Sequence, residues 1–161
     1  MKVLFLSIVF VAAFYPVLSD NFQEQKKQNY IMHGTSLFRK ARDSFNKNYL
    51  KNTVTTIREF LLLYPDHPDR MEAMKLLSQS YKKAGLYARA IKIDTEIYLE
   101  NPATEDGIRS YLSAAKSYFK IGETGKARYI LESIKGQDYI SSLAEDADLE
   151  LKIMNILNDQ D

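Results

Sequence analysis

Residues 71–102 read MEAMKLLSQSYKKAGLYARAIKIDTEIYLENP, and this stretch determines the expected fold. Its first half places Met74, Leu77 and Tyr81 three and four residues apart, the spacing of an apolar stripe on an amphipathic helix. Gly85 follows where that helix must end, because glycine adopts the left-handed backbone conformation at little cost. A second helical pattern comes next and is closed by a proline, which has no N–H to donate. The stretch therefore predicts a helical hairpin.

The same pattern recurs on both sides of this stretch with a period of 37 residues. The equivalent positions are Pro65 and Pro102, Tyr81 and Tyr118, Gly85 and Gly122, Ala90 and Ala127, and the series Phe60, Ile97 and Ile134. A fixed period of this size is typical of a solenoid of stacked helical hairpins. The two equivalent alanines are expected where helices cross closely, since a larger side chain would push the helices apart.

These positions resemble the tetratricopeptide repeat, whose consensus runs W-x2-L-G-x2-Y and continues with Ala, Phe and Pro. The residues in those places are, in order, Met74, Leu77, Ser78, Tyr81, Ala90, Asp94 and Pro102. The Trp, Gly and Phe of the consensus are thus replaced. The resemblance implies an all-α, right-handed superhelix of about three hairpins, covering about residues 34–65, 71–102 and 108–136. In such arrays the first helices of the hairpins line a concave groove for a partner segment.

A narrower resemblance comes from the dipeptide Asn48-Tyr49, from the junction Tyr-Pro-Asp-His-Pro at residues 64–68, and from the repeat spacing. Together with an apolar N-terminal run, these features resemble exported repeat proteins of bacterial envelopes of the BamD and YbgF type. This resemblance implies a non-catalytic scaffold or adaptor in the periplasm. The chain departs from the BamD type, which is lipidated on a cysteine and has five repeats, because no Cys is present and about three repeats are expected.

The N-terminus has the pattern of a secretory signal. Lys2 precedes an uncharged apolar run at residues 3–15, and residues 17–19, Val-Leu-Ser, offer small or compact side chains for cleavage before Asp20. The alternative is a retained anchor, but the apolar run of residues 3–18 is shorter than the roughly 20 residues that a spanning helix needs. We therefore expect residues 1–19 to be a cleaved signal, with no stable membrane span afterwards. Residues 20–33 are polar and are expected to form a mobile leader.

Composition disfavours several classes of function. The 161 residues include no Cys and only two His, so an exported chain must be held together by packing without disulfides. We expect no metal site and no cofactor, because no His lies four residues from another ligand and no glycine-rich phosphate loop occurs. Catalytic residues are likewise not expected. Neither half of the chain is basic enough to indicate nucleic acid as a partner.

The C-terminal segment, residues 141–161, predicts a capping helix followed by an acidic tail. It carries six carboxylates against Lys152, a net charge of −5, whereas residues 20–140 carry +5. Its periodicity predicts an apolar side toward the third hairpin and an acidic side toward solvent. Opposite charges leave open a self-associating array, in which this helix docks in the groove of a neighbouring copy.

The expected partner-binding groove lies on the exposed sides of the first helices. Its candidate residues are Arg42, Phe45, Asn46, Lys75, Gln79, Lys82, Arg109, Leu112, Lys116, Phe119 and Lys120. Basic side chains interleaved with apolar ones favour an acidic or amphipathic segment of another protein. The alternative is that these lysines serve solubility alone, as on many exposed helix faces.

Overall fold

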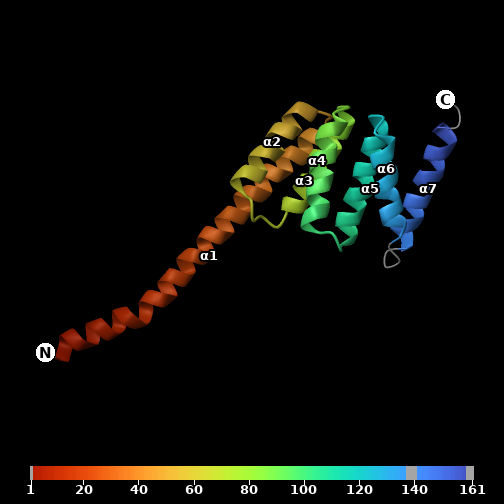
Figure 1. Cartoon of the computed structure of the whole chain (residues 1–161). Coiled ribbons are helices and arrows are strands. Elements are labelled where there is room, and N and C mark those ends of the chain that lie inside the picture. Colours follow the sequence, from red (N-terminus) through yellow and green to blue (C-terminus); the bar gives the residue numbers. More distant parts are fainter. Residues whose placement is uncertain (1, 137–140, 159–161) are drawn as a thin grey trace.

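The computed structural model describes residues 2–136 and 141–158, which form helices without a strand (Figure 1). The helices are α1 (Lys2–Asn46), α2 (Leu50–Leu63), α3 (Arg70–Lys83), α4 (Tyr87–Glu100), α5 (Glu105–Lys120), α6 (Thr124–Lys135) and α7 (Ser141–Asn158). Each helix packs on the next, and α5 also contacts α7. The all-α prediction of stacked helical hairpins is thus confirmed.

The turn inside each hairpin repeats with the period of the sequence. Asn48, Gly85 and Gly122 have positive φ angles of 60°, 72° and 80°. After each of them, a backbone N–H reaches back across the turn to a carbonyl of the preceding helix. These hydrogen bonds are Tyr49 to Ser44 at 2.9 Å, Leu86 to Tyr81 at 2.8 Å and Glu123 to Tyr118 at 3.0 Å. The bonds satisfy carbonyl groups that the helix end would otherwise leave without a partner.

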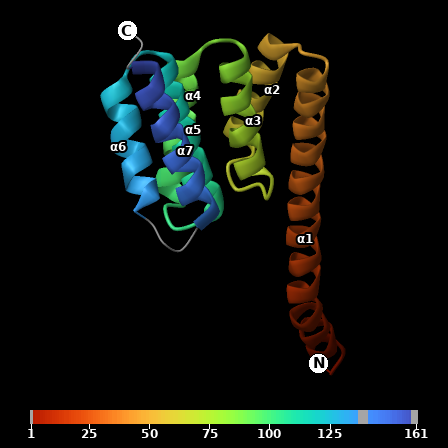
Figure 2. The same ribbon diagram turned by 90° about the vertical axis from the view of Figure 1, so that its right-hand side faces the viewer.

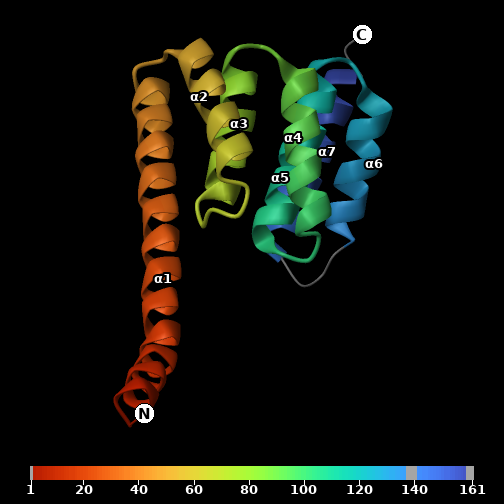
Figure 3. The same cartoon turned by 90° about the vertical axis from the view of Figure 1, so that its left-hand side faces the viewer.

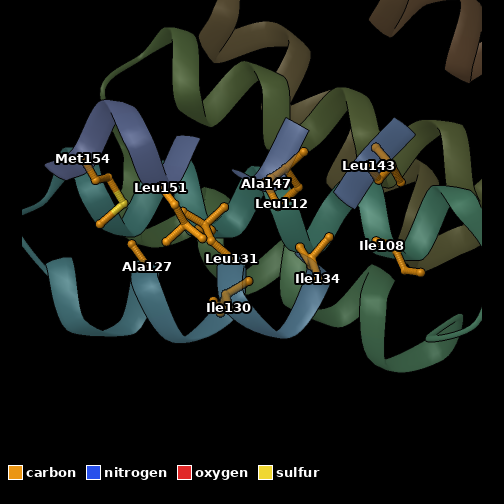
Figure 4. Packing of buried hydrophobic residues seen from close by; sticks show 11 residues of the cluster. Ile108, Leu112, Ala127, Ile130, Leu131, Ile134, Leu143, Ala147, Leu151 and Met154 are labelled. Carbon is orange, nitrogen blue, oxygen red and sulfur yellow. The ribbon is translucent and has the colours of Figure 1, made fainter. Parts of the chain in front are cut away.

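The hairpins stack side by side, while the N-terminal half of α1 projects away from them (Figures 2 and 3). Helices α1 through α4 share one apolar core. Helices α5, α6 and α7 share a second one, which Figure 4 shows. Ala90 and Ala127 have no exposed surface, as expected for residues at close helix crossings. Among the residues that the structure describes, no helix is both long and apolar enough to cross a membrane.

The expected mobile leader at residues 20–33 is helical and belongs to α1. The ring of Tyr30 packs edge-on against Tyr64, and its hydroxyl accepts a hydrogen bond from the backbone N–H of Asp66. His67, in the junction at residues 64–68, is buried and hydrogen-bonded to the carbonyl of Ile31. Composition could not reveal these contacts, because the hydrogen-bonded residues are 36 positions apart in the sequence.

The capping helix α7 covers the third hairpin as expected, with Leu143, Ala147, Leu151 and Met154 in the core (Figure 4). The prediction of an acidic outer side is wrong in part. Four large apolar side chains of α7 are exposed, namely Leu149, Ile153, Ile156 and Leu157. The acidic tail at residues 159–161 lies outside the described residues.

Candidate binding groove

Two adjoining pockets run along the side of the chain formed by α1, α3 and α5. The first measures about 290 Å³ and the second about 180 Å³. Lys75 and Gln79 of α3 line both pockets and form the wall between them. We call the two pockets together the first-helix groove, because each of these helices begins a hairpin.

The first pocket has an apolar base and a charged rim. Phe38 of α1 and Leu76 of α3 supply the apolar side chains. Arg42, Asp69, Glu72 and Lys75 supply the charged side chains of the lining. The guanidinium of Arg42 lies 6.0 Å from the centre of the Phe38 ring, within reach of a cation–π interaction. This pocket can accept an apolar side chain flanked by groups of either charge.

The second pocket contains a buried carboxylate. Asp94 of α4 has a nearly inaccessible side chain and accepts a hydrogen bond of 2.7 Å from the hydroxyl of Ser113 on α5. Lys82 of α3 places its ammonium 3.4 Å from the same carboxylate and also contacts the Ser113 hydroxyl. Three helices therefore meet at one polar cluster. The ammonium compensates the buried charge of the carboxylate.

Lys75 bridges α3 and α5 at the wall between the pockets. Its ammonium lies 2.8 Å from a carboxylate oxygen of Glu72 and 2.6 Å from one of Asp106. Partial burial acts to lower the pKa of Lys75, but the hydrogen bonds to these two carboxylates outweigh it and raise that pKa. The bridge holds Lys75 across the groove wall.

Most of the basic residues that were expected to line the groove form ion pairs with nearby carboxylates. Arg109 lies 2.5 Å from Glu105, and Lys116 lies 2.7 Å from Glu150 of α7. The expected surface of basic side chains interleaved with apolar ones therefore also carries acidic groups. The acidic partners come from the first turn of α5, from α4 and from α7, so inspection of one helix face at a time did not reveal them. The groove carries both charges in alternation.

The remaining candidate residues occupy different environments. Arg42, Asn46 and Lys120 are exposed, and Phe45 is half-buried beneath the ammonium of Lys83, at 4.6 Å. Two of the apolar candidates contribute to core packing. Leu112 is 5% exposed and belongs to the core, so its expected place on the groove surface is wrong, and half-buried Phe119 packs against the same core. On α5, the buried face is wider than the sequence positions equivalent to Tyr81 and its apolar neighbours predicted, because it also includes Leu112.

Several groove residues were not among the candidates, namely Phe38, Asp69, Glu72, Leu76, Asp94, Asp106, Ser110 and Ser113. One sequence signal could have identified Asp94, because it stands where the repeat consensus has Phe. Among the described residues, no group of three or more His, Cys, Asp or Glu side chains is arranged to hold a metal ion.

Comparison with known proteins supports the fold. The chain resembles the crystal structure of PcrH from Pseudomonas aeruginosa with a TM-score of 0.61 and 17% sequence identity, over 76% of this chain and 92% of that one. This likeness supports a tetratricopeptide-like helical repeat, and it gives no support to the narrower resemblance to BamD and YbgF. No family model matches the sequence, and no curated protein matches it.

Proposed function

We propose that the chain is a non-catalytic protein–protein interaction scaffold that binds an extended or amphipathic segment of another protein in the first-helix groove. The observation that carries this proposal is the pair of adjoining pockets that share Lys75 and Gln79. A segment lying across α1, α3 and α5 can place an apolar side chain against Phe38 and Leu76. Its polar or charged neighbours then meet the second pocket.

The alternating charges favour a partner segment that itself carries both charges, which refines the expectation of an acidic partner. An acidic segment alone would meet Glu72 and Asp106 beside Lys75. Opposed charge patterns fix the register of a bound segment and disfavour segments of the wrong pattern. The likeness to PcrH supports the repeat architecture that such a groove requires.

Blocking the groove without disturbing the core is the direct test. Gln79 is exposed and lines both pockets, so Gln79→Trp adds bulk where a partner would lie. Lys92, exposed on α4, provides the matched control Lys92→Trp. Peptides selected from a random display library for binding to the full chain should lose affinity for Gln79→Trp and keep it for Lys92→Trp. Equal binding to both variants would contradict the proposal.

Charge reversal at Lys75 is a poorer test, because Lys75→Glu would place three carboxylates together between α3 and α5. The three would be the new Glu with Glu72 and Asp106, which Lys75 now bridges. A loss of partner binding by this variant would then be indistinguishable from the effect of a loss of folding stability. Gln79→Trp avoids this ambiguity.

Export to the bacterial cell envelope is part of the same proposal. It is supported by Lys2, by the apolar run of residues 3–18 and by the compact residues 17–19. Removal of residues 1–19 would leave the contacts of Tyr30 and Ile31 with the first hairpin intact. N-terminal sequencing of the protein from fractionated cells should give Asp20 in the periplasmic fraction. Recovery of a product that retains Met1 in the membrane fraction would contradict export with cleavage.

A further inference from the structure

A further pocket lies on another side of α5, and three tyrosines are among its six lining residues. It measures about 300 Å³, and its lining residues are Tyr111, Tyr118, Gly125, Lys126, Tyr129 and Ile130. The first-helix groove uses a different set of α5 residues, namely Arg109, Ser110 and Ser113. We call this second site the tyrosine pocket.

The aromatic rings that line the tyrosine pocket come from α5 and α6, and one of them is supported by a ring of α4. Tyr98 of α4 stacks on Tyr111 of α5 with ring centres 4.0 Å apart and planes 4° from parallel. Tyr118 of α5 carries the ammonium of Lys126 over its ring at 5.6 Å. Tyr129 of α6 is 70% exposed. Core packing accounts for Tyr81, which is buried, but not for this exposed ring.

The hydroxyl of Tyr111 keeps its proton at neutral pH. Burial, together with neighbouring Tyr98, Tyr129 and Tyr118, raises the pKa of Tyr111 above its ordinary value. A phenol that keeps its proton can donate a hydrogen bond to a carbonyl oxygen. The pocket thus combines flat apolar walls with hydroxyl donors.

Gly125, near the start of α6, leaves part of the pocket open. A Cβ atom built on Gly125 would meet no other atom within 4 Å. Its φ angle is not in the left-handed region, so the glycine is not required by backbone conformation. Gly125 lines the pocket together with Tyr118 and Lys126, so a side chain added at this position would enter open space at the pocket.

We propose that the tyrosine pocket binds a proline-rich segment of a partner protein in the polyproline II conformation. Aromatic-lined grooves are the usual binding sites for such segments, whose extended backbone has no internal hydrogen bonds and presents carbonyls to donors. A strand would need an exposed sheet edge, and the described residues contain no sheet. An amphipathic helix needs a long apolar groove for anchors spaced over two turns, whereas Tyr111, Tyr118 and Tyr129 line a single open pocket of about 300 Å³.

Titration of the full chain with a synthetic oligoproline peptide tests the proposal. Binding can be followed by calorimetry and by tyrosine fluorescence, because the chain has no Trp whose emission would mask that of tyrosine. Saturable binding is expected for oligoproline and not for a glycine–serine peptide of the same length. Tyr129→Ala should raise the Kd about tenfold, since truncating an exposed aromatic anchor commonly costs that much. Tyr49→Ala, at an exposed tyrosine in the first hairpin turn, should leave the Kd unchanged.

Gly125→Leu separates binding from folding. The added side chain enters open space and replaces a poor helix former, so the melting temperature should be kept or raised while oligoproline binding is lost. Absence of saturable oligoproline binding to the wild-type chain would overturn the proposal. Unchanged binding by Gly125→Leu, or by Tyr129→Ala, would overturn it as well. Binding of an amphipathic helical peptide in place of oligoproline, abolished by these same variants, would overturn the assigned ligand class. Neither variant alters Gln79. Failure of the oligoproline proposal would therefore not contradict binding at the first-helix groove, which Gln79→Trp tests separately.

Discussion

The Nε2 atom of His67 lies 3.0 Å from the carbonyl oxygen of Ile31, joining α1 to the turn between the first and second hairpins. The other ring nitrogen, Nδ1, accepts a hydrogen bond of 3.0 Å from the backbone N–H of Asp69. The ring is almost fully buried and meets Phe60 and Tyr64 edge to face. A buried imidazole with both nitrogens engaged is a structural link between these two parts of the chain.

Replacement of His67 by Ala should therefore lower the free energy of unfolding by about 2–4 kcal/mol, because it opens a cavity and leaves the Ile31 carbonyl without its partner. Urea unfolding followed by circular dichroism measures this change. Met32→Ala, at an exposed position one residue from Ile31, is the control and should change stability little. Equal effects of the two substitutions would show that His67 does not link α1 to the repeats.

The buried cluster of the groove predicts strong coupling between Lys82 and Asp94. Lys82→Met should cost about 1–3 kcal/mol, since it removes the ammonium that compensates a nearly inaccessible carboxylate. Asp94→Leu combined with Lys82→Met should be less destabilising than the two single effects added together. A double-mutant cycle from urea unfolding measures this coupling. Strict additivity would contradict it.

Close helix crossings at the equivalent alanines predict a cost for larger side chains. Ala127→Leu or Ala90→Leu should each destabilise the fold by about 1–3 kcal/mol, because both positions are fully buried. Ala88→Leu, at an exposed position on α4, is the matched control and should be close to neutral. Thermal unfolding of the three variants measures the difference.

An ion-pair network on the last two helices predicts acid sensitivity. Hydrogen bonds from Lys135 and Lys152 lower the pKa of Asp148 from 3.8 to about 2. A carboxyl whose pKa falls on folding stabilises the folded state above its unfolded pKa, and this contribution is lost as pH falls through the folded value. The stability difference between wild type and Asp148→Asn should therefore shrink between about pH 4 and pH 2. In a Lys135→Met, Lys152→Met background that pH dependence should disappear, and its persistence would contradict the assignment.

Sequence periodicity predicted the hairpins because one repeating set of small, apolar and turn residues sets both the local conformation and the packing. Gly85 and Gly122 marked two of the turns directly. Asn48 adopts the same left-handed conformation in the first hairpin, but a single asparagine is a weaker signal than glycine. Periodicity could not place the ion partners of Lys75 and Lys116, since Asp106 and Glu150 lie on other helices. Those contacts depend on the spacing between stacked helices, which the sequence pattern does not specify.

Site-specific photocrosslinking in the native cell tests the first-helix groove most directly. A photoreactive amino acid would replace Gln79, which lines both pockets, or Lys92 on α4 as the control. If the first-helix groove binds the partner, a discrete crosslinked partner peptide is expected at Gln79, identified by mass spectrometry, and none of that partner at Lys92. Adding Leu76→Glu, which places a charge at the apolar base of the first pocket, should abolish the Gln79 crosslink. Capture of the partner at Lys92 and not at Gln79 would contradict the account and place binding outside the groove.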